Sequence, residues 1–478
     1  MFGKQSSSAP LDMLEGKLFA NVLRFALPVA ATGVLEQLFN ATGVAIVGNF
    51  SGADGTRDVA AVGANSFIVM LVISFFIGVA LGANVVIANA IGRGSMDGAR
   101  SATHTAIVMA LAGGVAFLAV GQLCAAPILR LLAVPSDVMP FALLYLRIYL
   151  IGLPVILLYN FEAAIFRASG DTRTPLKALV LAGLLNVAIG LALTAGLHMG
   201  VAGVAIGTVA ANAFSSLTLL RRLTRLDPDA PIHVDLRALR FDAMSARAIL
   251  RIGLPAGLQG AVFAFANVII QGAINTLGTT VIAASSAAFN IESLAYQVFN
   301  SFSQACATFT GQNSGAKQYA RCRRVLAVCY LEDLIATGSA IALVLAAGHL
   351  LLGLFVRDPE AVRLGYDRLL LVFVGYIFSM TYDVVSGYLR GFGISLAPAL
   401  LTVIGVCGVR IGWIAFVFPT HRDFLTIMMV YPISLAVTAA LLLAALAVCR
   451  PAWRALHNGQ GTGSKLRTPQ PHINHKFI

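Results

Sequence analysis

The sequence predicts an all-α polytopic membrane protein with twelve transmembrane helices. Of its 478 residues, 58% are hydrophobic and only 11% are charged. A helix needs roughly 20 apolar residues to span the hydrocarbon core, and many uncharged runs here reach that length. Backbone polar groups in lipid must bond within the protein, which restricts spanning segments to helices or closed barrels. Because the runs are continuous and lack the alternation of barrel strands, we predict helices.

The first half of the chain holds six predicted spans behind a polar tail at residues 1–16. The first apolar run is too long for a signal peptide and lacks a convincing cleavage site, so we interpret it as a span. We assign residues 17–223 to a first lobe. Its predicted spans are residues 18–50, 59–92, 101–124, 138–168, 175–197 and 201–223.

The second half repeats this plan after a polar connection rich in arginine. We interpret residues 224–247 as the linker, residues 248–449 as the second lobe and residues 450–478 as a basic polar tail. The predicted spans of the second lobe are residues 252–277, 281–311, 325–354, 369–390, 398–418 and 425–449.

The two halves carry the same order of aromatic, basic, glycine and proline residues. The corresponding pairs, all at one constant spacing, are Tyr159 and Tyr382, Arg167 and Arg390, Gly170 and Gly393, and Pro175 and Pro398. Self-similarity at a fixed period indicates a duplicated unit. Six spans return the chain to its starting side, so the two lobes share an orientation. We therefore predict a pseudo-two-fold axis along the membrane normal.

Basic residues collect in alternate connections, which predicts the orientation. Most of the 33 Lys and Arg residues lie in the tails, the linker and the connections on one side. The opposite loops hold Arg57, Arg130, Arg357, Arg363, Arg368 and Arg422. Because Lys and Arg favour the cytoplasmic side, we expect both termini in the cytoplasm. The bases lie in short loops rather than on one folded face, so we expect no nucleic-acid partner.

The chain lacks the short motifs of metal sites and of nucleotide hydrolysis. Its six cysteines form no CxxC pair and its eight histidines form no HExxH motif, so we predict no metal site. No GxxxxGK[ST] loop is present, which argues against ATP-driven chemistry in this chain. An intramembrane transferase would cluster His and Asp at one membrane face, whereas His104, His198 and His349 lie apart. We therefore expect neither an enzyme nor a cofactor.

Eight segments in order resemble the multidrug and toxic compound extrusion (MATE) family, and together they cover about residues 15–449. The segments are EGKLFANVLRFALP (15–28), LFNATGVAIVGNFSG (38–52), GVALGANVVIANAIGRG (78–94), LYLRIYLIGLP (144–154), YNFEAAIFRASGDTRTP (159–175), FSQACATFTGQNSGA (302–316), SGYLRGFG (386–393) and GVCGVRIGWI (405–414).

This resemblance implies a two-lobed antiporter of the bacterial inner membrane. Such proteins export small organic compounds, often cations, in exchange for entering H⁺ or Na⁺. We expect a monomer whose partners are the small-molecule substrate and the lipid bilayer.

The chain departs from the family at its first-lobe cation site. Many members carry an aspartate three residues after the asparagine that matches Asn40, where this chain has Gly43. Many carry another aspartate four residues after the asparagine that matches Asn186, where this chain has Gly190. The predicted seventh span, where some members have a glutamate, holds no acid. The coupling ion therefore does not follow from the resemblance.

Glu36 is the first candidate for the missing acid. A charged group near mid-bilayer costs roughly 2.5–3.5 kcal/mol on insertion scales, so it needs a partner, water or a function. Glu36 lies two helical turns before Gly43 and on nearly the same face. We expect Glu36 to bind the coupling ion or the substrate, with Gln37, Asn40 and Asn186 lining the cavity. The alternative is a carboxylate that bonds a neighbouring helix for packing.

Glu162 lies a little more than one turn before Arg167 in the predicted fourth span. We favour an interfacial ion pair of Glu162 with Arg167 or Arg173, and a role in ion coupling is the alternative. Tyr159, one turn earlier, is expected to line the cavity.

The second lobe supplies three further candidates. Asp383 lies two turns before Arg390, and Tyr382 beside it can stack on a cationic ligand. Glu292 lies near the middle of the predicted eighth span and Arg410 near the middle of the eleventh. A buried arginine needs an acidic partner, so we predict that Arg410 pairs with Asp383 or Glu292. Each acid is a candidate for ion coupling, and a structural ion pair is the alternative.

These residues suggest an exchange mechanism. Burial favours the protonated form of a carboxylate, so a proton and a lipophilic cation can compete for Glu36 or Asp383 while the lobes rock. The alternative function is a flippase of lipid-linked oligosaccharides or lipids, which shares this architecture. A flippase of this kind needs a strongly basic central cavity, and the predicted spans offer only Arg147 and Arg410.

Overall fold

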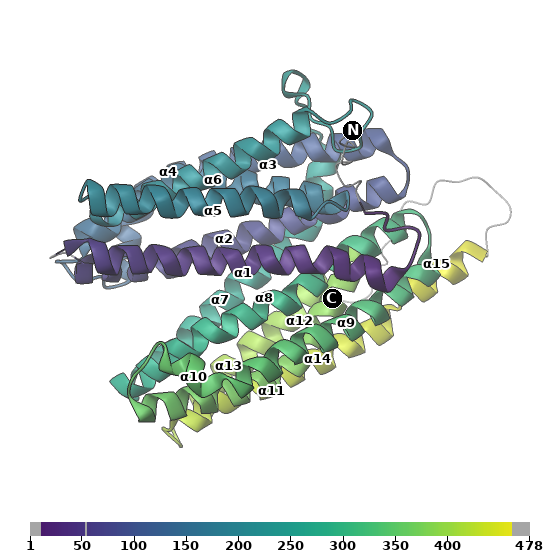
Figure 1. The fold of residues 1–478 in the computed structure, drawn as a ribbon. Helices are drawn as coiled ribbons and strands as arrows, with labels where there is room; N and C mark the ends of the chain where they lie inside the picture. The colour runs from purple at the N-terminus through teal and green to yellow at the C-terminus, as the bar shows by residue number, and fades with distance from the viewer. Residues whose placement is uncertain (1–10, 53–54, 461–478) are drawn as a thin grey trace, which may run out of the picture.

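The computed structural model describes residues 11–52 and 55–460, and the described part is helical without strands. Figure 1 shows two groups of long helices that lie side by side, α1 to α6 in one and α7 to α14 in the other. Eleven of the described helices are long and apolar enough to cross a membrane. The twelfth crossing is α8, which is long but carries many Ser, Thr, Asn and Gln residues. The predicted fold class is confirmed.

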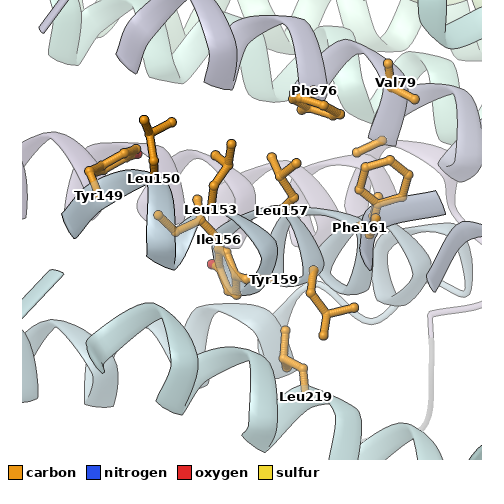
Figure 2. Packing of buried hydrophobic residues seen from close by; sticks show 14 of the residues in the cluster. Phe76, Val79, Tyr149, Leu150, Leu153, Ile156, Leu157, Tyr159, Phe161 and Leu219 are labelled. Atoms are coloured by element: carbon orange, nitrogen blue, oxygen red, sulfur yellow. The ribbon is translucent and has the colours of Figure 1, made fainter. Parts of the chain in front are cut away.

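The first lobe contains six long helices, and its first helix has the predicted bounds. Its elements are α1 (Leu18–Phe50), α2 (Gly55–Gly92), α3 (Met96–Leu131), α4 (Met139–Ala168), α5 (Arg173–Leu191), which a π-helical turn continues to Gly196, and α6 (Gly200–Thr224). Apolar residues of α2, α3 and α6 pack against α4. Figure 2 shows part of this core.

The second lobe repeats this arrangement. Its elements are α7 (Ala243–Asn275), α8 (Thr279–Gly315), α9 (Tyr319–Ala346), the short α10 (Gly348–Gly353), α11 (Pro359–Gly391), α12 (Leu396–Thr402), α13 (Val409–Gly412), α14 (Phe424–Cys449) and α15 (Pro451–Gln460). π-Helical turns at Val403–Gly408 and Trp413–Val417 join α12 and α13 into one distorted crossing.

Several predicted bounds need correction. α7 begins at Ala243 rather than near residue 252, because Asp242 caps it within the polar connection. α11 begins at Pro359, so Arg368 lies inside this helix and not in an outer loop as predicted. Residues 451–460 form α15, a helix within the segment that we predicted as a polar tail. Helix ends in amphipathic sequence are set by capping, which hydropathy does not report.

Helices α1 and α7 each contact both lobes. The first half of α1 packs Val22, Phe25 and Val29 against α8 and α9. Its second half packs against α5 and α6, where a side chain at Gly43 would meet Val204 of α6. In the same way, α7 of the second lobe packs along α2 of the first. Each of the two helices contains a proline, Pro28 or Pro255.

The contacts between α2 and the second lobe depend on small residues. A side chain at Gly92 would collide with the backbone of Gln312, and one at Gly315 would collide with that of Asn89. The Thr308 hydroxyl of α8 donates to Asn84 of α2 at 2.8 Å. Backbones approach this closely in membrane proteins where glycine removes the side chain. These contacts hold the two lobes together on one side of the molecule.

That side is also where the connection between α6 and α7 lies, and we call it the linker side. The linker, residues 225–242, docks on α3, where Arg100 donates to the carbonyl of Ala230 at 3.2 Å. The Asp242 carboxylate accepts hydrogen bonds from the Ser245 hydroxyl and from the backbone of Ser245 and Met244. These bonds, those from Ser245 most strongly, lower the pKa of Asp242. Away from the linker side, the two helix groups spread apart (Figure 1).

Candidate functional site

The interior polar residues gather in two clusters, one in each lobe. The first-lobe cluster consists of Glu36 on α1 with Tyr149, Tyr159 and Arg167 on α4. Glu36 is partly buried and interacts electrostatically with Arg167 and both tyrosines. The Tyr159 side chain is only 3% exposed, and its hydroxyl has no hydrogen-bond partner in the described part of the chain. The cluster therefore contains one acid, one base and a buried tyrosine hydroxyl that lacks a hydrogen-bond partner among the described residues.

The fourth helix positions this cluster because its apolar face is fixed by packing. Figure 2 shows Leu150, Leu153 and Leu157 on α4 within the apolar core of the first lobe. Tyr159 extends from the same helix toward the α6 segment that carries Leu219 (Figure 2). Tyr159 itself belongs to this core, and Arg167 lies about two turns after it on α4.

The positions of the two absent family acids are packed by apolar side chains. A side chain at Gly43 would lie 3.3 Å from a methyl group of Val204, and one at Gly190 would lie 3.5 Å from Ile46. The ring of Phe39 occupies the space where Gly183 lacks a side chain. The positions of Gly43, Gly190 and Gly183 are therefore covered by apolar side chains of α1 and α6.

The other first-lobe candidates differ in exposure. Gln37 and Asn186 are partly buried and Asn40 is exposed. The Asn186 amide oxygen lies against Gly207 of α6, where a Cβ would approach it to 3.2 Å. No described contact brings these three amides to Glu36, so their role in lining a cavity stays a prediction.

Glu162 does not form the predicted ion pair. Its side chain is fully buried, and neither carboxylate oxygen has a hydrogen-bond partner among the described residues. Ser216 of α6 is its polar neighbour, while Arg167 interacts electrostatically with Tyr159 and Glu36. The prediction failed because sequence spacing fixes height along α4 but not the direction of the Arg167 side chain.

The second-lobe cluster consists of Asp383, Tyr382 and Arg390 on α11 with Gln259 on α7 and Tyr296 on α8. Asp383 is 8% exposed and its Oδ2 has no hydrogen-bond partner in the described residues. Arg390 interacts electrostatically with Asp383, but it donates its hydrogen bond to Gln259 at 2.6 Å. Tyr382 and Tyr296 also interact electrostatically with Asp383. One carboxylate oxygen therefore stays free beside a basic group.

The repeat places the two clusters at related positions. Arg167 and Arg390 are equivalent residues in the last turns of α4 and α11, and Tyr159 and Tyr382 are equivalent residues two turns earlier. The acids are not equivalent, because Glu36 lies on α1 and Asp383 lies on α11. Each lobe thus combines one acid with the equivalent arginine. The acid comes from α1 in the first lobe and from α11, the helix of the arginine itself, in the second.

Glu292 belongs to neither cluster. It forms a buried ion pair with Arg368 of α11, which also donates to the Ser285 hydroxyl at 2.5 Å. Glu292 and Arg368 are 4% and 2% exposed. The predicted pairing of Glu292 or Asp383 with Arg410 is therefore wrong, because Glu292 pairs with Arg368. A role of Glu292 in ion coupling stays a prediction.

Arg410 is enclosed by neutral groups. It donates to the Asn267 amide oxygen at 2.7 Å and to the Ser434 hydroxyl at 3.3 Å. Its guanidinium carbon lies 4.6 Å from the ring centre of Tyr431 and 5.1 Å from that of Phe263. Two cation–π contacts and two hydrogen bonds thus stabilise this buried charge in place of an acid.

One cavity of about 280 Å³ lies apart from both clusters. It is lined by apolar residues of α2, α3, α4, the linker and α7, among them Phe75, Phe76, Phe117, Phe161 and Phe241. Phe75, Phe76 and Phe117 contact one another edge-on or stacked, with ring centres between 4.8 and 6.3 Å apart. The cavity carries no charged lining residue.

Sequence reasoning missed three charged residues of the second-lobe interior. Glu332 and Asp333 of α9 are 2% and 0% exposed, although both lie inside a span that was predicted. Charge within a predicted span was the signal that could have found them. Arg368 was missed because the predicted span began one residue after it.

The comparisons with known proteins agree with this architecture. The sequence profile of the MatE family matches residues 28–192 and 255–414. The chain is 26% identical over 428 residues to the probable multidrug resistance protein YoeA of Bacillus subtilis, covering 87% of this chain and 91% of that protein. It is 25% identical over 350 residues to a FAD transporter of Shewanella oneidensis, covering 70% of this chain and 76% of that protein.

A solved structure described as an outward-facing conformation of a multidrug resistance MATE family transporter has the same fold. Its TM-score is 0.85 at 20% identity, with 94% of this chain and 100% of that chain covered. The family profile covers helices of both lobes. The chain therefore belongs to the MatE family, the multidrug and toxic compound extrusion transporters, and is a multi-pass membrane protein for the efflux of small organic compounds.

Proposed function

We propose that this protein exports lipophilic organic cations in exchange for protons, with Na⁺ as the alternative coupling ion. Asp383 with Arg390 and Glu36 with Arg167 form the exchange sites. The observation that carries this proposal is the free Oδ2 of Asp383, which is buried and unpartnered while Arg390 donates to Gln259. A buried carboxylate oxygen without a hydrogen-bond donor can bind either a proton or a cationic group.

The proposed cycle uses competition at one oxygen. When Asp383 is ionised, the aromatic rings of Tyr382 and Tyr296 and the carboxylate together suit an amphiphilic cation. When a proton binds Oδ2, the negative charge is lost and the cation is released. A proton needs a single acceptor oxygen, whereas hard metal cations such as Mg²⁺ use about six oxygen ligands. This difference favours the proton over Na⁺.

Two features support cationic rather than anionic cargo. Arg167 and Arg390 each face an acid, so neither presents an uncompensated positive charge. Arg147 is exposed on α4, and Arg410 is enclosed by Asn267, Ser434 and two rings. A flippase of anionic lipid-linked sugars needs free basic groups in its cavity. Cationic cargo is therefore the better match for these interior charges.

We also propose the orientation and assembly of the protein. The linker side carries Arg100 and the basic linker, so it faces the cytoplasm of a bacterial cell, with both termini on that side. The protein then lies in the inner membrane with its lobes in contact on the cytoplasmic side. We propose that it acts as a monomer, because each cluster is built within one chain.

The test measures ethidium efflux by everted membrane vesicles under an imposed proton gradient. We expect Glu36→Gln combined with Asp383→Asn to reduce coupled efflux at least tenfold, which corresponds to about 1.4 kcal/mol. Glu360→Gln is the matched control, since Glu360 is an exposed acid at the start of α11. Unchanged efflux in the double variant, at equal protein levels, would contradict the proposal.

A second arm of this assay identifies the coupling ion. Choline replaces Na⁺ at constant pH while efflux is recorded. Efflux that persists without Na⁺ and stops when the proton gradient is collapsed supports proton exchange. Loss of efflux on Na⁺ removal assigns Na⁺ instead.

A further inference from the structure

The buried face of α9 carries two consecutive acids that the proposed cycle does not use. Glu332 is 2% exposed and Asp333 is not exposed at all. Both lie on the face that holds the buried residues Cys329 and Thr337. Two acids in the interior of a membrane-spanning helix are rare, and such residues mark ion or proton pathways.

The hydrogen bonds of this pair are incomplete. The Thr337 hydroxyl donates to Oδ1 of Asp333 at 2.7 Å. Oδ2 of Asp333 and both carboxylate oxygens of Glu332 have no partner in the described part of the chain. No basic side chain among the described residues forms an ion pair with either acid. Because two adjacent unpaired negative charges would be strongly disfavoured there, the pair must hold at least one proton.

A third buried carboxylate, that of Asp383, lies on the neighbouring helix α11. Asp383 of α11 interacts electrostatically with Asp333, and its own Oδ2 is buried and unpartnered. The two helices are joined close by, where the hydroxyl groups of Tyr330 and Thr381 lie 3.2 Å apart. The open carboxylate oxygens of α9 and α11 therefore lie on two helices that contact each other.

The other neighbours of the pair that the structure describes are a cysteine pair and apolar side chains. Cys329 of α9 interacts with both acids, and Cys306 of α8 contacts Cys329. α1 contributes apolar residues to this region, among them Phe25 and Val29. Asp383 is thus the charged group that faces the pair from the packed helices, and Arg390 lies beyond it.

We propose that Glu332 and Asp333 form a proton-holding site that exchanges its proton with Asp383. This inference rests on the proposed function, because it needs Asp383 to gain and lose a proton. When a cation binds Asp383, the O–H bond of its carboxyl breaks and an O–H bond forms at Asp333 or Glu332. The total number of negative charges among the three acids then stays constant, which limits the cost of ionising Asp383 within the membrane.

The first test counts the protons released when ethidium binds the purified full-length protein in a weakly buffered solution. We expect wild-type protein and Glu360→Gln to release the same number. Glu332→Gln/Asp333→Asn leaves Asp383 without its proton acceptor. Because the wild type keeps this proton on α9, we expect the variant to release about one more proton per bound ethidium, and to bind ethidium with a changed pH dependence. The same count in wild type and double variant would overturn the inference.

A second test needs no variant and so does not depend on folding. Dicyclohexylcarbodiimide reacts with protonated carboxyl groups in apolar surroundings, and mass spectrometry locates the adduct. We expect an adduct on Glu332 or Asp333 of the wild-type protein near neutral pH, and none on exposed Glu360. Absence of an adduct on both α9 acids would overturn the inference.

Asp383→Asn separates this inference from the proposed function. If Asp383→Asn abolishes ethidium-linked proton release but Glu332→Gln/Asp333→Asn leaves it unchanged, the α9 site is wrong and the exchange at Asp383 stands. If neither variant changes the release, both ideas fail. If Glu332→Gln/Asp333→Asn releases about one proton more than the wild type and the added change Asp383→Asn abolishes this release, both ideas are supported.

Discussion

Arg368 of α11 forms a buried ion pair with Glu292 of α8, and it also contacts the faces of Phe289 and Tyr431. Arg410 also contacts the ring of Tyr431, with its guanidinium 4.6 Å from the ring centre. Tyr431 of α14 therefore connects two buried arginines that differ in one respect. Among the described residues, Arg368 has an acidic partner, whereas the partners of Arg410 are neutral.

This difference predicts unequal costs for removing the two arginines. Arg368→Met leaves Glu292 buried and unpaired, which costs about 3–5 kcal/mol of stability. Arg410→Met removes hydrogen bonds to neutral groups and leaves no charge behind, so we expect a cost of about 1–3 kcal/mol. Thermal unfolding of the two variants in the same detergent checks the order. Arg368→Met combined with Glu292→Leu should recover stability, and equal costs for the two single variants would contradict the predicted order.

Alternate exposure of the proposed exchange sites would require the linker-side contact between the lobes to open. The Thr308 hydroxyl lies 2.8 Å from Asn84 across this contact. We expect a disulfide in Asn84→Cys/Thr308→Cys, made in a background without the six native cysteines, to reduce efflux at least tenfold and reductant to restore it. Vesicle efflux before and after reductant is the measurement. Full efflux by a protein that is quantitatively cross-linked would show that this contact does not move.

The contact between Gly183 and Phe39 predicts that a side chain added at residue 183 would overpack the first lobe. Its missing side chain leaves the space that the Phe39 ring occupies, whereas Gly63 of α2 has no neighbour within 4 Å of a Cβ. Gly183→Ala should cost about 1–3 kcal/mol through overpacking. Gly63→Ala should be neutral or stabilising by up to about 1 kcal/mol, because alanine favours the helix. Thermal unfolding measures both, and Phe39→Leu should relieve the conflict at Gly183.

The positions of Glu36 and Gly43 on α1 predict that an acid at residue 43 can partly replace the acid at residue 36. Both lie on nearly the same face of α1, two turns apart. We expect Glu36→Gln to lower proton-coupled ethidium efflux and the added change Gly43→Asp to restore part of it. Val204, which would lie 3.3 Å from the new Cβ, must shift slightly to admit the carboxylate. Gly63→Asp, placed on α2, is the control that should not rescue. Efflux that stays equally low with Gly43→Asp would argue that Glu36 acts only at its own position.

Much of the fold could be predicted because a membrane-spanning helix is recognised from the hydropathy of its own residues. The predicted first span matches α1 at both ends, and the crossings of both lobes appear in the predicted order. The family resemblance is confirmed by the match of the MatE profile to both halves. Ends fixed by polar caps, such as Asp242 before α7 and Asp358 before α11, were missed by several residues.

The partners of the interior charges could not be predicted in the same way. Glu162 was expected to bond a nearby arginine, yet its carboxylate has no hydrogen-bond partner among the described residues and Arg167 interacts electrostatically with Glu36 of another helix. Glu292 was expected beside Arg410, yet its partner is Arg368. The combination of Asp333 with Asp383 likewise joins residues from two helices.

The sequence by itself determined how many times the chain crosses the bilayer, its duplication and which ionisable groups enter the spans. These follow from hydropathy, charge and spacing along one helix. Only the tertiary structure decided which of those groups meet. Pairing depends on the rotation and axial shift of each helix against its neighbours, and those are set by close contacts such as Gly92 against Gln312 and Gly183 against Phe39.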